Sequence, residues 1–282
     1  MMQENYRKLL TYSYNIVGCY EDAKDVVQDV VEKYISLDKS KIRDESNFLI
    51  KSVVNHSINF KKRQRKKDNF GEWLPEPISF DHPDTNLIKQ QTAAYTMLVL
   101  LEHLSPKERA VFILKSGFDY THYEIAELLS ISQENSRQLY SRASRTLKTK
   151  NFVEPSEVTV QLEAIKKYQE VLSGANISEL ETLLISDIRL TADGGKKVQV
   201  FKGVEIGVKN TISLLGIIQQ QFLYNKKFSF HEFNHQVAIC FWDKDKLYNC
   251  QILEVDPNGK IRNIYSIVDP EKLKNIQLMS HF

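Results

Sequence analysis

Two helix-start signals in the middle of the chain constrain its fold more than any other feature. Ser105, Pro106 and Glu108 form the first, and Thr121 with Glu124 forms the second. In such a capping box the hydroxyl accepts a hydrogen bond from the third helical N–H, and the glutamate accepts one from the N–H of the capping residue. Proline suits the first helical position because it gives up no intrahelical bond there. The pattern predicts helices that begin directly after Ser105 and Thr121.

The segment from Thr121 to Lys148 has the outline of a helix-turn-helix. A short helix is followed by a turn at Ser130–Ser132, and Ser132 caps a longer helix. The inward face of the longer helix should carry Ser136, Leu139, Tyr140, Ala143 and Leu147. Its opposite face carries side chains suited to base edges and phosphates: Glu134, Arg137, Gln138, Ser141, Arg142 and Arg145. The competing interpretation is a solvated outer face of an amphipathic helix.

A run of positive charge, KKRQRKK, ends an apolar-periodic helix that should start near Glu45. Its cations can displace counterions from a nucleic acid, so binding should depend steeply on salt. They are Lys61, Lys62, Arg63, Arg65, Lys66 and Lys67. Asn55, His56 and Asn59 precede the run on the same helix and can hydrogen-bond unpaired base edges. A solvated tail is the alternative for the run, and a half-buried helix position is the alternative for His56.

The segment GEWLPEP, residues 71–77, follows the basic run closely. Two prolines with fixed φ and an aromatic residue between the charges favour an extended shape over a flexible linker. We therefore predict a connector that is held by another surface of the protein, with Trp73, Leu74 and Pro75 as the part that is held.

Composition allows two or three compact units in 282 residues. Residues 1–150 hold 23 Lys/Arg against 20 Asp/Glu, whereas residues 151–282 hold 15 against 16, so the net charge of +2 hides a basic N-terminal half. Cys19, Cys240 and Cys250 show no metal-ligand or CxxC spacing, which favours reduced thiols in a cytoplasmic protein. Neither a signal peptide nor a membrane span is expected.

The pattern of predicted secondary structure changes after Pro155. Helices are predicted at 157–172, 177–184 and 208–222. Strands are predicted at 187–193 and 196–201 around a Gly194-Gly195 turn, and then in four successive segments that begin at FSFHEFN and end at KIRNIYSIV. Helices followed by a meander indicate an α+β domain in which helices cover one face of a curved sheet.

Residues 5–37 also have helical spacing, and one face of that region is acidic. With this helix, the first 150 positions resemble an extracytoplasmic-function sigma factor. EDAKDVVQDVVEKY resembles the polymerase-docking helix, NFLIKSVVNHSINFKKRQRKK the helix that reads the −10 promoter element, and the helix-turn-helix the −35 reader. WLPEP, the DGG at 193–195 and the VDPEKL at 268–273 resemble the subgroup with a fused SnoaL-like C-terminal domain.

The resemblance implies a multidomain fold with two all-α sigma domains, a helical bundle at 1–68 and a helix-turn-helix domain at 87–150. A linker at 69–86 joins them, and a cone-shaped α+β domain follows at 156–282. It also implies a promoter-specific transcription initiation factor that is regulated in cis by the C-terminal domain. Core RNA polymerase would meet Asp25, Gln28 and Asp29, promoter DNA is the second partner, and the C-terminal cavity could hold an unknown small ligand.

Catalysis, a cofactor and a metal are not expected. The alternative is a SnoaL-type enzyme or sensor with a DNA-binding module, for which the available groups are Asp187, Asp193, His231 and His235. A dimeric helix-turn-helix repressor is a third interpretation, but it has no use for the acidic helix. For the leading hypothesis, the linker should be gripped by the glycine turn and the C-terminal motif, with Trp73 buried against the turn. The gripping residues would be Asp193, Gly194, Gly195, Lys196, Asp269 and Leu273.

Overall fold

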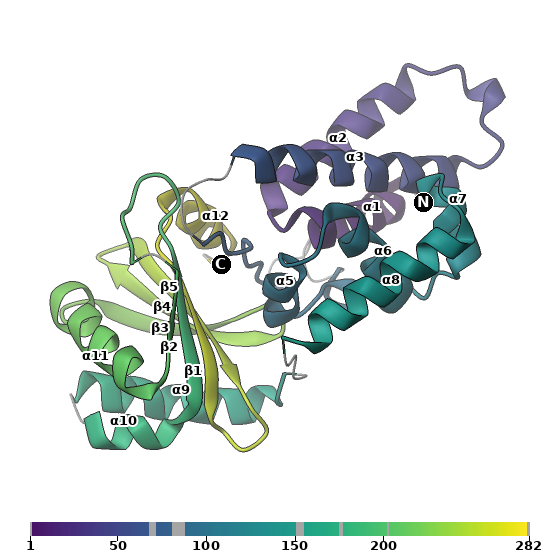
Figure 1. The fold of residues 1–282 in the computed structure, drawn as a ribbon. Coiled ribbons are helices and arrows are strands. Elements are labelled where there is room, and N and C mark those ends of the chain that lie inside the picture. The colour runs from purple at the N-terminus through teal and green to yellow at the C-terminus, as the bar shows by residue number, and fades with distance from the viewer. Residues whose placement is uncertain are drawn as a thin grey trace.

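The computed structural model describes residues 2–67, 72–80, 88–150, 155–174, 177–201 and 203–280. Figure 1 shows a helical half at the upper right and a sheet domain at the lower left, with α5 and the linker between them. Some expectations fall partly outside the described residues: the linker at 69–71 and 81–86, and the side chains of Lys66 and Lys67.

The helical half is built around one continuous hydrophobic core to which all its long helices contribute. Its α-helices are α1 Met2–Val17, α2 Tyr20–Ile35, α3 Glu45–Lys67, α5 Tyr95–Leu101, α6 Pro106–Gly117, α7 His122–Leu129 and α8 Gln133–Lys148. Short 3-10 helices occupy Lys39–Lys41 and Lys89–Gln91. Because α3 packs on both α1 and α6, the two helical domains form a single packed body in this arrangement.

The predicted helix starts are confirmed. Both capping boxes are complete, with the Ser105 hydroxyl accepting from Glu108 N–H and the Thr121 hydroxyl accepting from Glu124 N–H. Ser132 caps α8 by accepting from Asn135 N–H at 3.1 Å. These local signals decide where the helices of the helix-turn-helix begin.

Two expected helices are different in the structure. The helical stretch at 5–37 is interrupted between α1 and α2, where Gly18 takes φ +84°, a conformation that an L side chain rarely adopts. Apolar periodicity also predicts one helix from Leu87 to Leu104. The described part of this segment instead forms a 3-10 turn and the short α5, because it makes hydrogen bonds to other parts of the fold.

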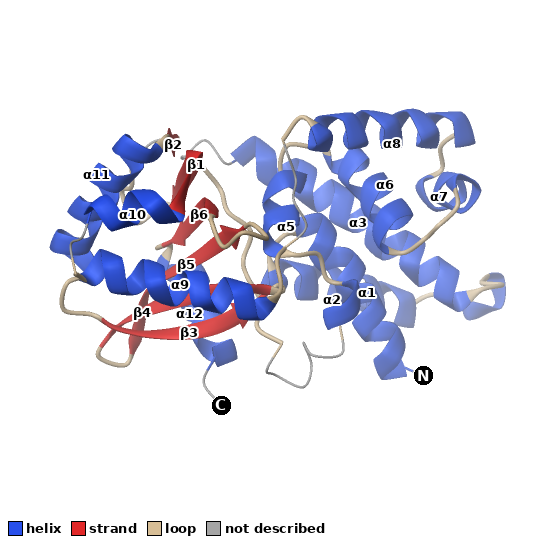
Figure 2. Ribbon diagram, turned by 90° about the horizontal axis from the view of Figure 1, so that it is seen from below, coloured by secondary structure: helices blue, strands red, loops and turns tan. Residues whose placement is uncertain are grey.

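The C-terminal domain contains a six-stranded sheet in the order β2-β1-β6-β5-β4-β3 (Figure 2). The strands are β1 Leu184–Asp193, β2 Val204–Ile206, β3 Lys227–Phe233, β4 Gln236–Asp243, β5 Lys246–Val255 and β6 Ile261–Ile267. β3 to β6 form the predicted antiparallel meander, and β1 joins β6 in parallel. The segment at 196–201 is not a strand, and the edge position is taken by β2 instead.

Different helices pack on the two faces of the sheet. The helices α9 Val158–Ser173, α10 Ile177–Leu183 and α11 Val208–Ile218, which continues in a π-helical turn at Gln219–Leu223, build one core with the sheet. A second core joins the sheet to α12 Pro270–Ser280, and it includes Leu74 and Tyr95 from outside the domain. The predicted α+β class is confirmed, and the linker is part of the packing of its sheet.

Candidate nucleic-acid interface and interdomain hinge

The outer face of α8 is exposed along its whole length. All six polar residues predicted for it are exposed, while Leu139, Ala143 and Leu147 are buried against the rest of the helix-turn-helix. Gln138 Nε2 donates to Glu134 Oε1 at 3.3 Å, and Arg142 Nε lies 3.7 Å from Glu108 Oε1. These are solvent-facing contacts that a competing phosphate or base edge can replace, so the surface is geometrically accessible to DNA.

The side chain of Asn55, predicted to read −10 bases, is engaged within the protein. Its Nδ2 atom donates to the carbonyl oxygen of Leu128, at the end of α7, at 3.0 Å. Lys51, one turn earlier on α3, donates to the carbonyl of Glu127 at 2.9 Å. The first helix of the helix-turn-helix therefore covers part of the α3 surface that carries the predicted −10 readers.

Other predicted −10 residues lie together on the open side of α3. His56, Asn59, Lys62 and Arg63 line a surface hollow of about 440 Å³. Burial and the nearby cation of Lys33 lower the pKa of His56, although Asp29 of α2 lies 3.5 Å away. The hollow combines an amide, an imidazole and two exposed cations, which are groups that can hold a base and its phosphate.

The exposed face of α2 carries Asp25, Gln28 and Asp29, the residues predicted to meet RNA polymerase. Gln28 bonds to Glu32 on the same helix, and the apolar side of α2 packs into the helical core. The contact between Asp29 and His56 joins this face directly to the hollow on α3.

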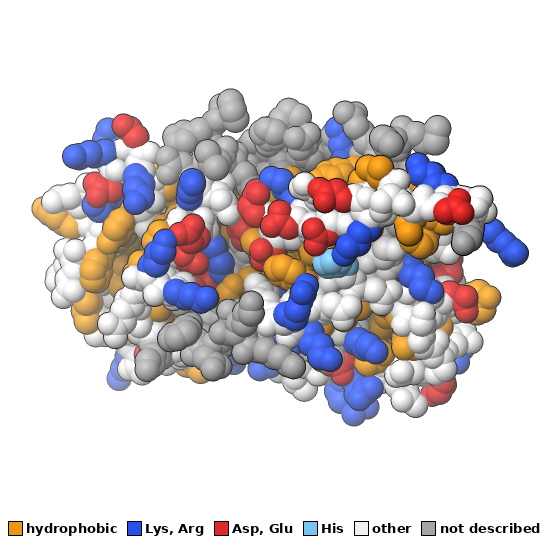
Figure 3. All heavy atoms as spheres, turned by 90° about the horizontal axis from the view of Figure 1, so that it is seen from above, with side chains coloured by type: hydrophobic (Ala, Val, Ile, Leu, Met, Phe, Trp, Pro, Cys, Tyr) orange, Lys and Arg blue, Asp and Glu red, His pale blue; other side chains and the backbone are white. Residues whose placement is uncertain are grey.

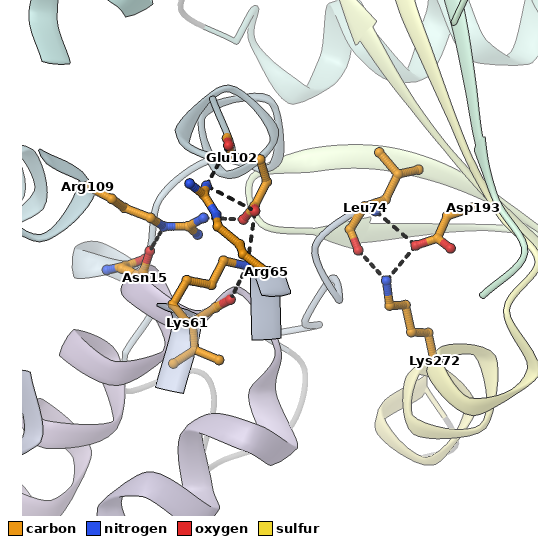
Figure 4. Close-up of polar contacts among 9 residues, drawn as sticks. Asn15, Lys61, Arg65, Leu74, Glu102, Arg109, Asp193 and Lys272 are labelled. Carbon is orange, nitrogen blue, oxygen red and sulfur yellow. Dashed lines mark hydrogen bonds and ion pairs between the residues drawn. The ribbon is translucent and has the colours of Figure 1, made fainter. Parts of the chain in front are cut away.

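The basic run does not form one uniform surface. Lys61 is 1% exposed: its Nζ atom donates to the carbonyl of Val17 at 2.8 Å and lies 3.0 Å from Glu102 Oε2. Arg65 donates to the carbonyl of Glu102, as Figure 4 shows. In this arrangement Lys61 and Arg65 bind α1 and the end of α5. Among the predicted phosphate contacts whose side chains the structure describes, Lys62 and Arg63 are the exposed ones.

Glu102 is the acceptor that collects these cations. Arg109 of α6, which is fully buried, pairs with the Glu102 carboxylate and donates from Nε to the carbonyl of Asn15 at 2.8 Å. Burial alone would raise the pKa of Glu102, but Arg109 and Lys61 outweigh it and the pKa is lowered. The cluster ties α1, α3, α5 and α6 together and so fixes the two sigma-like helical domains against each other.

Leu74 is held by its backbone. Its N–H donates to Asp193 Oδ2 at 2.9 Å, and its carbonyl accepts from Lys272 Nζ, which also pairs with Asp193 (Figure 4). The Leu74 side chain is 1% exposed and packs among Leu273 and strand residues of the second core. Asp193 and Leu273 were predicted at this contact, and Lys272 was missed although it lies in the same VDPEKL motif.

The ring of Trp73 lies between the helical half and α12. Lys61 Nζ is 3.8 Å from the ring centroid and Lys272 Nζ is 4.4 Å from it, so one indole contacts a cation from each half of the molecule. A Cβ atom placed on Gly18 would lie 3.0 Å from the Trp73 ring. The glycine at this close approach is Gly18, whereas the atoms nearest to Gly194 and Gly195 belong to Val198, Val200 and Asp269. The expected packing of Trp73 against the glycine turn stays a prediction.

The glycine turn makes close contacts within the C-terminal domain. Gly195 has φ +60°, and the carboxylate of Asp269 packs against it so closely that an added Cβ would lie 2.5 Å from that carboxylate. Asp269 N–H and Val268 N–H both donate to the Asp193 carbonyl, and Gly195 N–H donates to Asp193 Oδ1. The turn and the start of α12 thus orient Asp193 toward Leu74, whereas Lys196 is exposed.

The hairpin between β3 and β4 makes a second interdomain contact, which sequence reasoning missed. Asn234 Oδ1 accepts from Ile78 N–H at 2.8 Å, and Asn234 Nδ2 donates to Tyr14 Oη of α1 at 3.0 Å. Asn234 and His235 both have positive φ, at 47° and 63°. An Asn-His pair between two alternating apolar segments is a signal for a two-residue hairpin turn, but it does not indicate a distant partner.

Comparison with known proteins decides the family of this chain. Residues 1–67 match the sigma-70 region 2 family and residues 96–147 match the sigma-70 region 4 family. The chain is an extracytoplasmic-function sigma factor. It is 26% identical over 220 residues to "ECF RNA polymerase sigma factor SigJ" of Mycobacterium tuberculosis, covering 75% of this chain and 70% of the relative. It is 22% identical over 205 residues to "Probable ECF RNA polymerase sigma factor SigI" of the same organism, covering 71% of each chain.

A solved structure of an extracytoplasmic-function sigma factor shares the whole fold. The crystal structure of Mycobacterium tuberculosis SigJ matches with a TM-score of 0.78 and 21% identity, and the match covers 97% of each chain. The helical domains and the C-terminal sheet domain therefore occur together in the same arrangement in both proteins.

Three of the four groups named for an enzymatic C-terminal domain make separate contacts in this sigma factor. Asp193 is bound to Leu74 in the linker, which acts as the hinge, His235 Nε2 lies within hydrogen-bond distance of the Lys89 and Thr92 carbonyls, and His231 lies beside Ser229 on β3. Asp187 is exposed on β1, in the wall of a different pocket. Among the described residues, we find neither a His/Cys/Asp/Glu group that could hold a metal nor a helix that is long and apolar enough to cross a membrane.

Proposed function

We propose that this sigma factor directs core RNA polymerase to promoter DNA and that its C-terminal domain regulates, in cis, the separation of the two DNA-reading domains. Three surfaces support the first part: the exposed face of α8, the hollow on α3 and the acidic face of α2. Their residues suit −35 bases, −10 bases and a polymerase surface, respectively.

The state in this structure is proposed to be a closed state that cannot bind a promoter. The observation that carries this proposal is that Asn55, Lys61 and Arg65, three predicted DNA contacts, are bonded within the protein. The −10 and −35 readers are packed together here, and they must separate to span a promoter. The C-terminal domain favours the closed state because it holds Leu74, in the short connection between the two readers.

Run-off transcription with purified core polymerase tests both parts. The promoter would first be found by mapping transcription start sites after overexpression of the chain. The parent chain should support initiation there, and Lys272→Met should raise the output because it releases the Leu74 carbonyl and the Asp193 carboxylate. Lys274→Met is the matched control, since Lys274 is exposed on the same helix.

The two parts fail differently. If the parent chain and Lys272→Met both give no specific transcript with core polymerase, the initiation function is wrong. If both variants and the parent transcribe equally well, initiation stands and control by the hinge is wrong.

A further inference from the structure

The C-terminal domain contains a cavity at the end of the sheet where its two cores meet. The cavity measures about 370 Å³ and is lined mainly by apolar side chains from α11, β5, α12 and the loop after the glycine turn. Four large hydrophobic residues at its wall are more than one-third exposed: Val198, Ile217, Phe222 and Tyr248. Figure 3 shows hydrophobic side chains at the surface of this end of the molecule, on the left. The size is that of a small-molecule site.

One polar group in this wall lacks a partner. Asn249 on β5 is 3% exposed, and its Nδ2 atom donates to Ser266 Oγ at 2.9 Å. No donor among the described residues reaches Asn249 Oδ1, which is buried. A buried amide oxygen without a hydrogen bond costs about 1–3 kcal/mol. A group that brings a donor into the cavity would remove that cost.

We propose that this cavity binds a small, uncharged, largely apolar molecule that carries one hydroxyl or N–H group and donates it to Asn249 Oδ1. The apolar wall selects the body of the molecule, and the unpaired acceptor Asn249 Oδ1 selects its donor and orientation. A cation is disfavoured because the described wall contains no carboxylate. Its one ammonium group, Lys246, is exposed to solvent, so the buried part of the wall offers an anion no charged partner either.

The same molecule contacts the elements that hold the hinge. Pro270 and Leu273 of α12 line the cavity, and Lys272 between them bonds the Leu74 carbonyl. Ala192 also lines it and precedes Asp193, which accepts from Leu74 N–H. Since the cavity is complete with α12 in its gripping position, its ligand binds that arrangement preferentially and stabilises the closed state. The site itself stands on the cavity, whereas this consequence rests on the proposed control by the hinge.

Binding is tested on the full chain with N-phenyl-1-naphthylamine, a neutral apolar fluorophore with one N–H. Saturable one-to-one binding is expected, and the N-methyl analogue, which has no donor, should bind about tenfold more weakly. Asn249→Leu should abolish this difference between the two probes, a readout that a merely structural role would not change. If Asn249→Leu retains the tenfold preference, the proposal is overturned.

If Asn249→Leu does not fold, a variant at the surface of the cavity tests the binding site. Ile217→Trp should fill the mouth and weaken the probe at least tenfold, whereas Phe228→Trp, which changes an equally exposed residue outside the cavity, should bind like the parent. Equal binding by all three proteins overturns the site. A chain that binds no probe and sediments as a dimer, which Ile217→Asp separates, would assign the cavity to a second copy instead.

Hydrogen exchange of residues 72–80 tests the regulatory consequence. Saturating probe should slow exchange of the Leu74 amide, since its acceptor Asp193 adjoins the cavity wall. If the probe binds as expected but exchange at 72–80 is unchanged, the ligand site stands and its control of the hinge is wrong. Transcription by Lys272→Met remains a separate test of the hinge itself.

Discussion

The Nζ atom of Lys272 lies 2.5 Å from Oδ2 of Asp193, and both side chains are more than nine-tenths buried. The pair joins α12 to the last residue of β1, and both partners also hold the backbone of Leu74. A buried charge that loses its partner is costly, so each partner depends on the other.

A double-mutant cycle on this pair should show strong coupling. Asp193→Asn and Lys272→Met should each lower the free energy of unfolding by about 3–5 kcal/mol, because each leaves the other group charged and buried. The double variant should cost clearly less than the sum of the two. Chemical denaturation followed by circular dichroism measures this. The exposed pair Lys197–Glu271 is the control and should change stability little; additive effects at Asp193 and Lys272 would contradict the prediction.

Closure should strengthen with rising pH through Lys61. Burial lowers the pKa of Lys61 to about 7, against an ordinary 10.5. Between these values the open or unfolded chain binds the extra proton, so stability rises with pH from about 7 to 10.5 and the gain is absent below pH 7. The slope from this group is at most about 1.4 kcal/mol per pH unit. Denaturation midpoints of the parent should follow this trend relative to Lys61→Met, and parallel curves would rule it out.

Gly18→Ala should destabilise the protein more than Gly203→Ala. Both glycines have φ +84°, a conformation in which alanine is strained at either position. Only at Gly18 would the new methyl also press on the Trp73 ring and on Arg109 Nη2, at 3.0 and 3.2 Å. An extra loss of about 1–3 kcal/mol is expected at Gly18, measured by thermal unfolding. Equal losses for the two variants would mean that Trp73 yields freely.

Promoter binding should lose salt dependence when exposed cations are removed from α3. Lys62→Ala with Arg63→Ala should reduce the slope of log K against log salt by about 2, as two phosphate contacts disappear. The control is the double alanine substitution of Lys148 and Lys150, two exposed lysines at the end of α8 and just after it, which removes the same charge at another place on the surface. Filter binding of a promoter fragment at several salt concentrations measures the slope, and an unchanged slope would remove Lys62 and Arg63 from the interface.

Base reading by α8 should be local in the promoter. Gln138→Ala and Arg142→Ala should each cost about 1–3 kcal/mol at one or two −35 positions if the side chain contacts a base edge. Binding to a panel of single-base promoter variants shows whether the loss is confined to those positions. A uniform loss over the whole panel would assign the side chain to a phosphate.

Local signals explain why much of this fold could be predicted. Capping at Ser105, Thr121 and Ser132 is decided within four residues of each helix start, and the alternation in β3 to β6 is visible in short segments. The exposed face of α8 follows from the same periodicity. These features depend on neighbours along the chain, which a sequence displays directly.

The contacts between domains could not be predicted, because they join residues far apart in the chain. In the sequence, Lys61 is indistinguishable from the other cations of the basic run. It is buried because the fold places it opposite Glu102 and the carbonyl of Val17. Asn234 reads as a turn residue, yet it bonds Ile78 and Tyr14. In both cases the side chain has ordinary local chemistry, and its partner is set by the packing of complete domains.

The linker also covers an edge of the sheet. Ser79 pairs in antiparallel fashion with Phe233 at the end of β3, the last strand in the sheet order. An opened chain would therefore present an unpaired strand end together with the apolar seat of Leu74, and such edges promote self-association. A chain that opened in free solution would therefore be prone to aggregate. Release of the linker after the chain has bound the polymerase would avoid this, because the polymerase could cover the exposed strand end and the apolar surface.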